Sequence, residues 1–168
     1  MSEFKEIKPI ELNENTFKII GKDAMLITAE KDGKINTMTA SWGGLGVLWS
    51  MEVVFIFVRP QRYTKEFIEA NDYFSLSFLG ENYKKQLGYL GTVSGRDEDK
   101  IANSGLTLNN NENAPYFDES NKVIICKKLY EQDLKEEFFI DKSIIDKSYP
   151  DKDFHTVYVG KIEKVLVK

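Results

Sequence analysis

The pattern of apolar and polar positions along this chain predicts more strand than helix. Residues 24–29 are rich in apolar side chains, and the Asp32-Gly33 pair after them is a strong turn signal, so the chain is expected to return as the second strand of a β-hairpin. Residues 53–58 form an uninterrupted apolar run, typical of a strand covered on both faces, which Pro60 should end. The other expected strands are residues 73–79, 123–130 and 155–167.

Short helices and loops are expected between these strands. Thr64 should cap a helix that ends at Asn71, with Phe67 and Ile68 turned inward. The other expected helical segments are residues 82–90, 97–103 (stopped near Gly105) and 135–140. The expected loops are the glycine-rich 43–46, the asparagine-rich 107–114, and 148–153. Because strands outweigh helices and follow one another as hairpins, the fold class expected is mainly β, an antiparallel barrel with short peripheral helices.

Composition limits the classes of protein to consider. The 168 residues fit a single domain over residues 1–168, with no repeat or linker to divide it. A net charge of −4 argues against a general nucleic-acid or anionic-membrane surface. One cysteine, Cys126, excludes an internal disulfide and a cysteine-based metal cluster, and no metal site is expected. No apolar signal region and no span of about 20 apolar residues is present, which predicts a cytoplasmic protein.

The segment Asn36-Thr37-Met38-Thr39-Ala40-Ser41-Trp42 could supply a wall for a planar aromatic ligand. Ala40 and Ser41 are small enough for a close backbone approach, whereas Met38 and Trp42 offer polarizable or flat surface. The alternative is a core tryptophan at an ordinary strand end.

The segment Arg59-Pro60-Gln61-Arg62-Tyr63-Thr64 could bind a phosphate. A helix that starts at Thr64 would present free N–H groups to an anion, and an arginine adds a planar fork that suits phosphate. The alternative is that both arginines are solvated and Thr64 is only a cap.

A second candidate for the phosphate is Ser94-Gly95-Arg96-Asp97-Glu98-Asp99-Lys100. On a helix, Arg96 and Lys100 would share a face and would repel unless an anion lay between them. Ser94 adds a hydroxyl and Gly95 a backbone open to close approach. The alternative is a surface pair of Lys100 with Asp97, worth a few tenths of a kcal/mol.

His155 is the only histidine, and it begins the last expected strand. It could border a pocket and hydrogen-bond a flavin or nicotinamide edge, the alternative being an exposed loop histidine. Cys126 is expected to be a buried strand thiol rather than a redox group. The chain has no P-loop motif, and the glycines at 43–46 lack the context of a dinucleotide fingerprint.

Taken together, a ring-facing segment and two phosphate-facing segments suggest a site for flavin mononucleotide (FMN). In this order and spacing, they resemble the flavin reductase-like family of FMN-binding split barrels, specifically its flavoredoxin-type branch. The resemblance begins at about Asp23, and its other specific pieces are residues 89–93 and 155–162. The glycines after Trp42 depart from members with a bulkier residue there.

The resemblance implies a closed antiparallel barrel, a homodimer, and one FMN per subunit near the dimer interface. It places Asn36 and Trp42 by the flavin ring, and His155 near the mouth of the pocket. The groups that it places by the phosphate are Thr64 and Lys100, with Arg59, Arg62, Ser94 and Arg96 as helpers.

The leading hypothesis is an FMN-dependent oxidoreductase that passes electrons from a reduced donor, NADH or NADPH, through flavin to an acceptor. The flavin would do the chemistry, so no protein general base or nucleophile is expected. Two alternatives stay open. One is an electron carrier of the flavoredoxin kind, fed by a redox protein partner, and the other is a non-catalytic binder of an anionic aromatic ligand.

Overall fold

The structure is a computed structural model that describes residues 3–168. Strands make up most of it. The strands are β1 (Lys5–Ile7), β2 (Met25–Lys31), β3 (Lys34–Ala40), β4 (Gly43–Leu48), β5 (Met51–Val58), β6 (Tyr73–Phe78), β7 (Leu108–Asn109), β8 (Tyr116–Phe117), β9 (Lys122–Asp133) and β10 (Thr156–Val167). All but β7 and β8 belong to one sheet, and every pairing within it is antiparallel.

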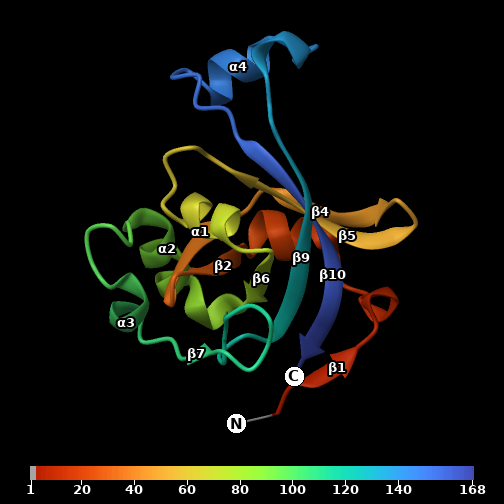
Figure 1. Cartoon of the computed structure of the whole chain (residues 1–168), viewed down its shortest axis with the longest axis vertical. Coiled ribbons are helices and arrows are strands. Elements are labelled where there is room, and N and C mark those ends of the chain that lie inside the picture. Colours follow the sequence, from red (N-terminus) through yellow and green to blue (C-terminus); the bar gives the residue numbers. More distant parts are fainter. Residues whose placement is uncertain (1–2) are drawn as a thin grey trace.

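This sheet is curved but does not close. Its order is β3-β2-β6-β9-β10-β5-β4, with β1 paired to β10 outside that path. The edge strands β3 and β4 do not pair with each other within residues 3–168. The expectation of a closed barrel is therefore wrong, whereas the split form of the antiparallel barrel is confirmed. The long strands β9 and β10 run through the middle of the molecule (Figure 1).

The helices are short and lie outside the sheet. They are α1 (Thr64–Ala70), α2 (Lys84–Thr92), α3 (Lys100–Ser104) and α4 (Ser143–Ser148), with single turns η1 (Pro9–Glu11), η2 (Phe17–Lys22), η3 (Glu81–Tyr83) and η4 (Glu136–Phe138). In Figure 1, α1, α2 and α3 lie on one side of β9, whereas α4 stands apart at the far end of the β9–β10 pair. In the part of the chain described, no helix combines the length and the apolar character needed to cross a membrane.

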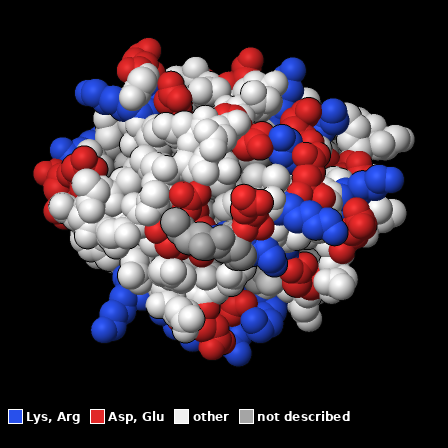
Figure 2. All heavy atoms as spheres, turned by 90° about the horizontal axis from the view of Figure 1, so that it is seen from below, with Lys and Arg blue, Asp and Glu red and all other residues white. Residues whose placement is uncertain are grey.

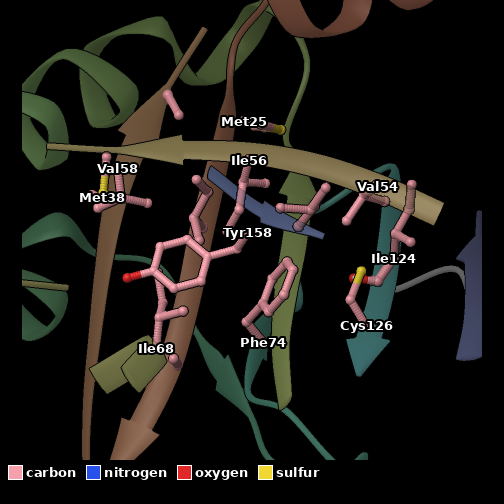
Figure 3. Close-up of a cluster of buried hydrophobic side chains, with 14 of the residues drawn as sticks. Met25, Met38, Val54, Ile56, Val58, Ile68, Phe74, Ile124, Cys126 and Tyr158 are labelled. Atoms are coloured by element: carbon pink, nitrogen blue, oxygen red, sulfur yellow. The ribbon is translucent and has the colours of Figure 1, made fainter. Parts of the chain in front are cut away.

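The main core lies between the strands and the inner face of α1. Figure 3 shows the rings of Tyr158 and Phe74 among aliphatic side chains of neighbouring strands. Phe67 and Ile68 of α1 are buried against the same cluster, as the sequence predicts. Each such side chain contributes roughly 1.5–3 kcal/mol by leaving water. Cys126 is fully buried there, and burial raises the pKa of its thiol, which confirms the expected inert strand cysteine.

Several predicted element boundaries need correction. Residues 43–46 are not a loop but the start of β4, paired with β5 from Gly43 opposite Ile56. Glycine is needed there because a Cβ on Gly43 would lie 2.7 Å from the carbonyl oxygen of Phe55. Helix α3 begins at Lys100 rather than at 97, and α4 was not expected at all. The hairpin of β2 and β3, with its turn at Asp32-Gly33, is confirmed.

Charged side chains of both signs cover the surface. Figure 2 shows one face, seen from below relative to Figure 1, on which acidic and basic groups are interspersed. Mixed charge of this kind gives no single-sign field across that face.

Candidate functional site

The first two segments singled out in the sequence meet along β3. Asn36, on β3, donates from Nδ2 to Oγ1 of Thr64 at 2.9 Å. Arg62, in the turn before α1, donates to the carbonyl oxygen of Thr39 at 3.3 Å and to that of Gly91 at 2.8 Å. Strand β3, the start of α1 and the end of α2 are therefore joined by side-chain hydrogen bonds around one place.

Two adjoining cavities open at this junction. The larger has a volume of about 690 Å³ and the smaller about 160 Å³. Both are lined by Asn36, Tyr63 and Lys100. The smaller cavity also has Met38, Arg62, Thr64 and Ser94 in its wall, and the larger one has Gly95 and Arg96. The larger volume lies in the range of small-molecule sites.

The loop before α3 approaches β3 very closely at Gly95. A Cβ at this position would lie 2.3 Å from Oδ1 of Asn36 and 3.3 Å from Cδ1 of Tyr63. Real atoms do not approach that closely, so only glycine fits beside the Asn36 amide. The close approach keeps Ser94 and Lys100 next to β3.

Lys100 is a buried cation with part of its hydrogen-bonding capacity unused. Its side chain is 4% exposed, and Nζ donates to the carbonyl oxygens of Leu90 and Val93, each at 2.9 Å. An ammonium group has three N–H donors, so one is left for a ligand in the cavity. Burial, with a smaller effect of nearby Arg62, lowers the pKa of Lys100 to about 8. The alternative of a surface pair with Asp97 is wrong, since Lys100 has no ion pair within the described residues.

Arg96 does not share a helix face with Lys100, because α3 starts only at Lys100. Its guanidinium lies 4.5 Å from the centre of the Tyr63 ring and pairs with Glu66 at 2.6 Å. The hydrogen bond from Arg96 is the largest influence that lowers the pKa of Glu66. Arg96 thus lines the larger cavity with its charge already matched by a carboxylate.

Thr64 is the first residue of α1 and does not cap it through its side chain. The hydroxyl instead accepts the hydrogen bond from Asn36 and is 1% exposed. The predicted capping role is therefore wrong. Thr64 and Lys100, which the resemblance places together by the phosphate, both line the smaller cavity, and Asn36 lines it too.

The residues from Met38 to Ser41 alternate between the core and the outside, and Trp42 is exposed as well. Met38 and Ala40 are buried in the main core, and Met38 also lines the smaller cavity. Thr39 faces the other way and donates to the carbonyl oxygen of Leu87 on α2 at 2.6 Å. Ser41 is exposed and Trp42 is 49% exposed, so the alternative of a core tryptophan is wrong.

A second cluster lies around Trp42. The ring of His155 is 5.0 Å from that of Trp42, and Nδ1 of His155 is 2.7 Å from the hydroxyl of Tyr149. Arg59 lies over the Tyr149 ring at 5.0 Å, pairs with Asp153 at 2.6 Å, and donates to the carbonyl oxygen of Ser148. Arg59 lines neither of the two cavities.

His155 is buried just before β10, so the alternative of an exposed loop histidine is wrong. Burial, together with Arg59 and Arg62, lowers the pKa of His155 to about 4, although Asp153 acts in the opposite direction. Arg62, the smallest of these influences, also lines the smaller cavity.

We expect the imidazole of His155 to stay neutral as the pH falls from 7 to about 4, whereas an unperturbed histidine would gain its proton near pH 6.5. NMR titration of this single histidine, with any affinity tag removed, measures the pKa directly. A midpoint above pH 6 would contradict the burial seen here.

Tyr149 and Asp153 belong to these clusters and were missed by sequence reasoning. Gly91 stands in the segment 89–93 that carries the resemblance, but its contact with Arg62 is made by the backbone and was not predicted. Tyr149 and Asp153 stood in an expected surface loop, and only the fold brings them against Arg59 and His155.

Comparison with known proteins shows the family of this chain. The profile of the flavin reductase like domain matches residues 18–168. The chain belongs to this family. Among solved structures, the chain is similar to the flavoredoxin of Methanosarcina acetivorans, which is 25% identical, with 96% of this chain and 76% of that chain covered and a TM-score of 0.68.

Other similar proteins agree with this assignment. The flavoredoxin of Desulfovibrio vulgaris (Miyazaki F) is 25% identical, with 86% of this chain and 69% of that chain covered and a TM-score of 0.66. An FMN-binding domain of a flavin reductase-like enzyme from Shewanella baltica shares the fold at a TM-score of 0.72, with 14% identity over 98% of this chain and 77% of that chain. The uncharacterized protein YddH of Escherichia coli (strain K12) is 33% identical over 102 residues, which cover 60% of this chain and 53% of YddH. The chain thus spans about half the length of that curated relative.

The donors of the flavin reductase-like site fit FMN. A phosphate dianion needs cations and N–H donors, and the smaller cavity offers Arg62, Lys100 and the Asn36 amide. The unused N–H of Lys100 leaves one donor for an anion at this point. Half-exposed Trp42, beside His155, offers a flat surface outside the cavities.

Proposed function

We propose that this protein binds FMN and passes electrons through it from a reduced donor to an acceptor. Lys100, Arg62, Thr64 and Ser94 would hold the phosphate end, and Trp42 and His155 would lie by the ring. Asn36, which the resemblance places by the ring, would lie nearer the phosphate, because it lines the same small cavity as Lys100 and Thr64. The isoalloxazine supplies hydride or single-electron transfer when bound. Arg59 and Arg96 each pair with a carboxylate, so their charge is already matched. Their roles as helpers in binding the phosphate stay predictions.

One observation carries the proposal. Three segments far apart in sequence contribute Asn36, Arg62 and Lys100 to the wall of one small cavity in a chain of the flavin reductase-like family. Lys100 is buried and Arg62 is partly buried. Within the described residues, the side chains of both donate only to backbone carbonyl oxygens. A buried and a partly buried cation without a carboxylate partner favour an anionic ligand, because taking a charge out of water without a counter-charge is costly.

Titration with FMN tests this proposal. The purified protein should carry a flavin absorption spectrum, or acquire a perturbed one when FMN is added, with saturation at one FMN per chain. Riboflavin, which lacks the phosphate, should bind more weakly and serves as the matched ligand. A protein that perturbs the spectrum of neither compound at any concentration does not have the proposed function.

The donor separates the leading candidate from its rivals. We propose NADH or NADPH as the donor, because a nicotinamide could stack on an exposed flavin face without a dinucleotide-binding domain of its own. Anaerobic bleaching of the flavin by NADH or NADPH alone supports this. Bleaching only with a redox protein supports a flavoredoxin-like carrier, and tight binding without turnover by any donor supports a non-catalytic binder. A homodimer is part of the proposal and is checked by light scattering.

A further inference from the structure

Tyr149 makes a hydrogen bond that the proposed function does not use. It follows α4 directly, and its hydroxyl lies 2.7 Å from Nδ1 of His155. We propose that Tyr149 is a positioning residue, which donates to Nδ1 of His155 and thereby fixes the imidazole as the tautomer with its proton on Nε2, a hydrogen-bond donor beside Trp42. The assignment of the tautomer rests on the geometry alone, whereas the use of the Nε2 donor by a ligand rests on the proposed function.

The direction of the hydrogen bond follows from the partners of the phenol. Tyr149 is 4% exposed, and its hydroxyl has no other side-chain partner among residues 3–168. If Nδ1 carried the proton and donated, the buried O–H of Tyr149 would be left without an acceptor, at a cost of roughly 1–3 kcal/mol. If Tyr149 donates, its own proton and the Nδ1 lone pair are both satisfied.

Neither partner is charged at neutral pH. Burial raises the pKa of Tyr149, so its phenol keeps the proton that it donates. The Arg59 guanidinium lies over the Tyr149 ring and disfavours an imidazolium nearby. A neutral imidazole with Nδ1 as acceptor must carry its proton on Nε2.

Nε2 is the ring nitrogen left for a ligand, because it makes no hydrogen bond within the described residues. The Trp42 ring, 5.0 Å from the imidazole, is 49% exposed at the same place. A donor there suits an acceptor atom of a planar ligand, such as a carbonyl or carboxamide oxygen.

Tyr149 is itself held in place from several sides. Arg59 lies over its ring, pairs with Asp153 and donates to the carbonyl oxygen of Ser148, the last residue of α4. Phe154 packs against the Tyr149 ring, with ring centres 5.0 Å apart. These contacts give the phenol one position, so the hydrogen bond to Nδ1 does not depend on a mobile side chain.

Nitrogen NMR of the single histidine tests the proposal without FMN or activity. In the uniformly ¹⁵N-labelled, tag-free protein, long-range proton–nitrogen correlation should show Nε2 as protonated and Nδ1 as unprotonated at pH 7. Nδ1 as the protonated nitrogen overturns the proposal, whatever happens with any variant.

Tyr149→Phe removes only the donor. The Nδ1 resonance should move toward the position of an imidazole that exchanges between tautomers in water, in a protein whose amide spectrum is otherwise folded. An unchanged imidazole pattern in folded Tyr149→Phe overturns the positioning role. Tyr130→Phe is the matched control, because the phenol of Tyr130 bonds Gln132 at the surface and its loss should leave His155 unchanged.

Adding FMN and then a nicotinamide to the wild-type protein tests the use of the donor. The Nε2 resonance should shift with one of them, and Tyr149→Phe should lose that shift while still binding FMN through the groups at the phosphate end, because Tyr149 lines neither cavity. Bound FMN and nicotinamide with no shift at Nε2 overturn the ligand role. If FMN does not bind at all, the proposed function fails while the tautomer result stands on its own.

Discussion

Lys100→Ala should bind FMN roughly 10- to 150-fold more weakly than the wild-type protein, because a charge-assisted hydrogen bond to the phosphate contributes about 1.5–3 kcal/mol. Riboflavin affinity should change little, since riboflavin has no phosphate. Fluorescence titration of both flavins measures the two Kd values. Equal weakening of FMN and riboflavin would remove Lys100 from the phosphate site.

A second replacement separates charge from structure. Lys100 also donates to the carbonyl oxygens of Leu90 and Val93, so alanine removes two structural hydrogen bonds together with the charge. Lys100→Gln keeps an N–H₂ group that can donate to these carbonyls but has no charge. It should lose FMN affinity like Lys100→Ala while unfolding at a denaturant concentration closer to that of the wild type. Lys22→Gln, at an exposed position, is the control for a general loss of positive charge.

Gly95→Ala should both destabilise the fold and weaken FMN binding. A Cβ at Gly95 would lie 2.3 Å from Oδ1 of Asn36, and the Asn36 amide is buried and bonded to Thr64. Making room for the methyl group must move that amide or the loop that carries Ser94 and Lys100. Overpacking of this kind costs typically about 1–3 kcal/mol in the free energy of unfolding. We expect FMN affinity to fall by at least about tenfold, since the displaced groups line the cavity.

Gly88→Ala is the matched control for Gly95→Ala. No atom lies within 4 Å of a Cβ built at Gly88, which is exposed on α2. Alanine favours a helix over glycine by up to about 1 kcal/mol, so this variant should be as stable as the wild type or more so. A double-mutant cycle identifies the contact itself. In the Asn36→Ala background, Gly95→Ala should cost little additional stability, and a full additive cost would place the strain elsewhere.

Elements specified by neighbouring residues were predictable. Asp32 and Gly33 specify the turn between β2 and β3 locally, and the apolar run of β5 needs only a covering layer on each side. The glycines that begin β4 misled the prediction because glycine is typical of loops, whereas here pairing with β5 and the close approach to Phe55 decide the conformation. Helix α4 has neither a strong cap nor a long apolar face, so its short sequence gave no signal.

The candidate site was predictable in its members but not in its contacts. Asn36, Thr64 and Lys100 were singled out for residue type and spacing, and the structure places all three at one cavity. The burial of Lys100, the pair of Arg96 with Glu66, and the bond between Tyr149 and His155 depend on chain segments that meet only after folding. No local pattern encodes such meetings, because each involves positions on different elements.

Both tryptophans of this chain lie at the surface, with Trp42 49% and Trp49 54% exposed. Indole emission from the native state therefore starts from a largely wet environment. Unfolding therefore changes the solvent exposure of the two indole rings only in part, and tryptophan emission should report unfolding weakly. The same emission should respond to a molecule that binds over either tryptophan at the surface.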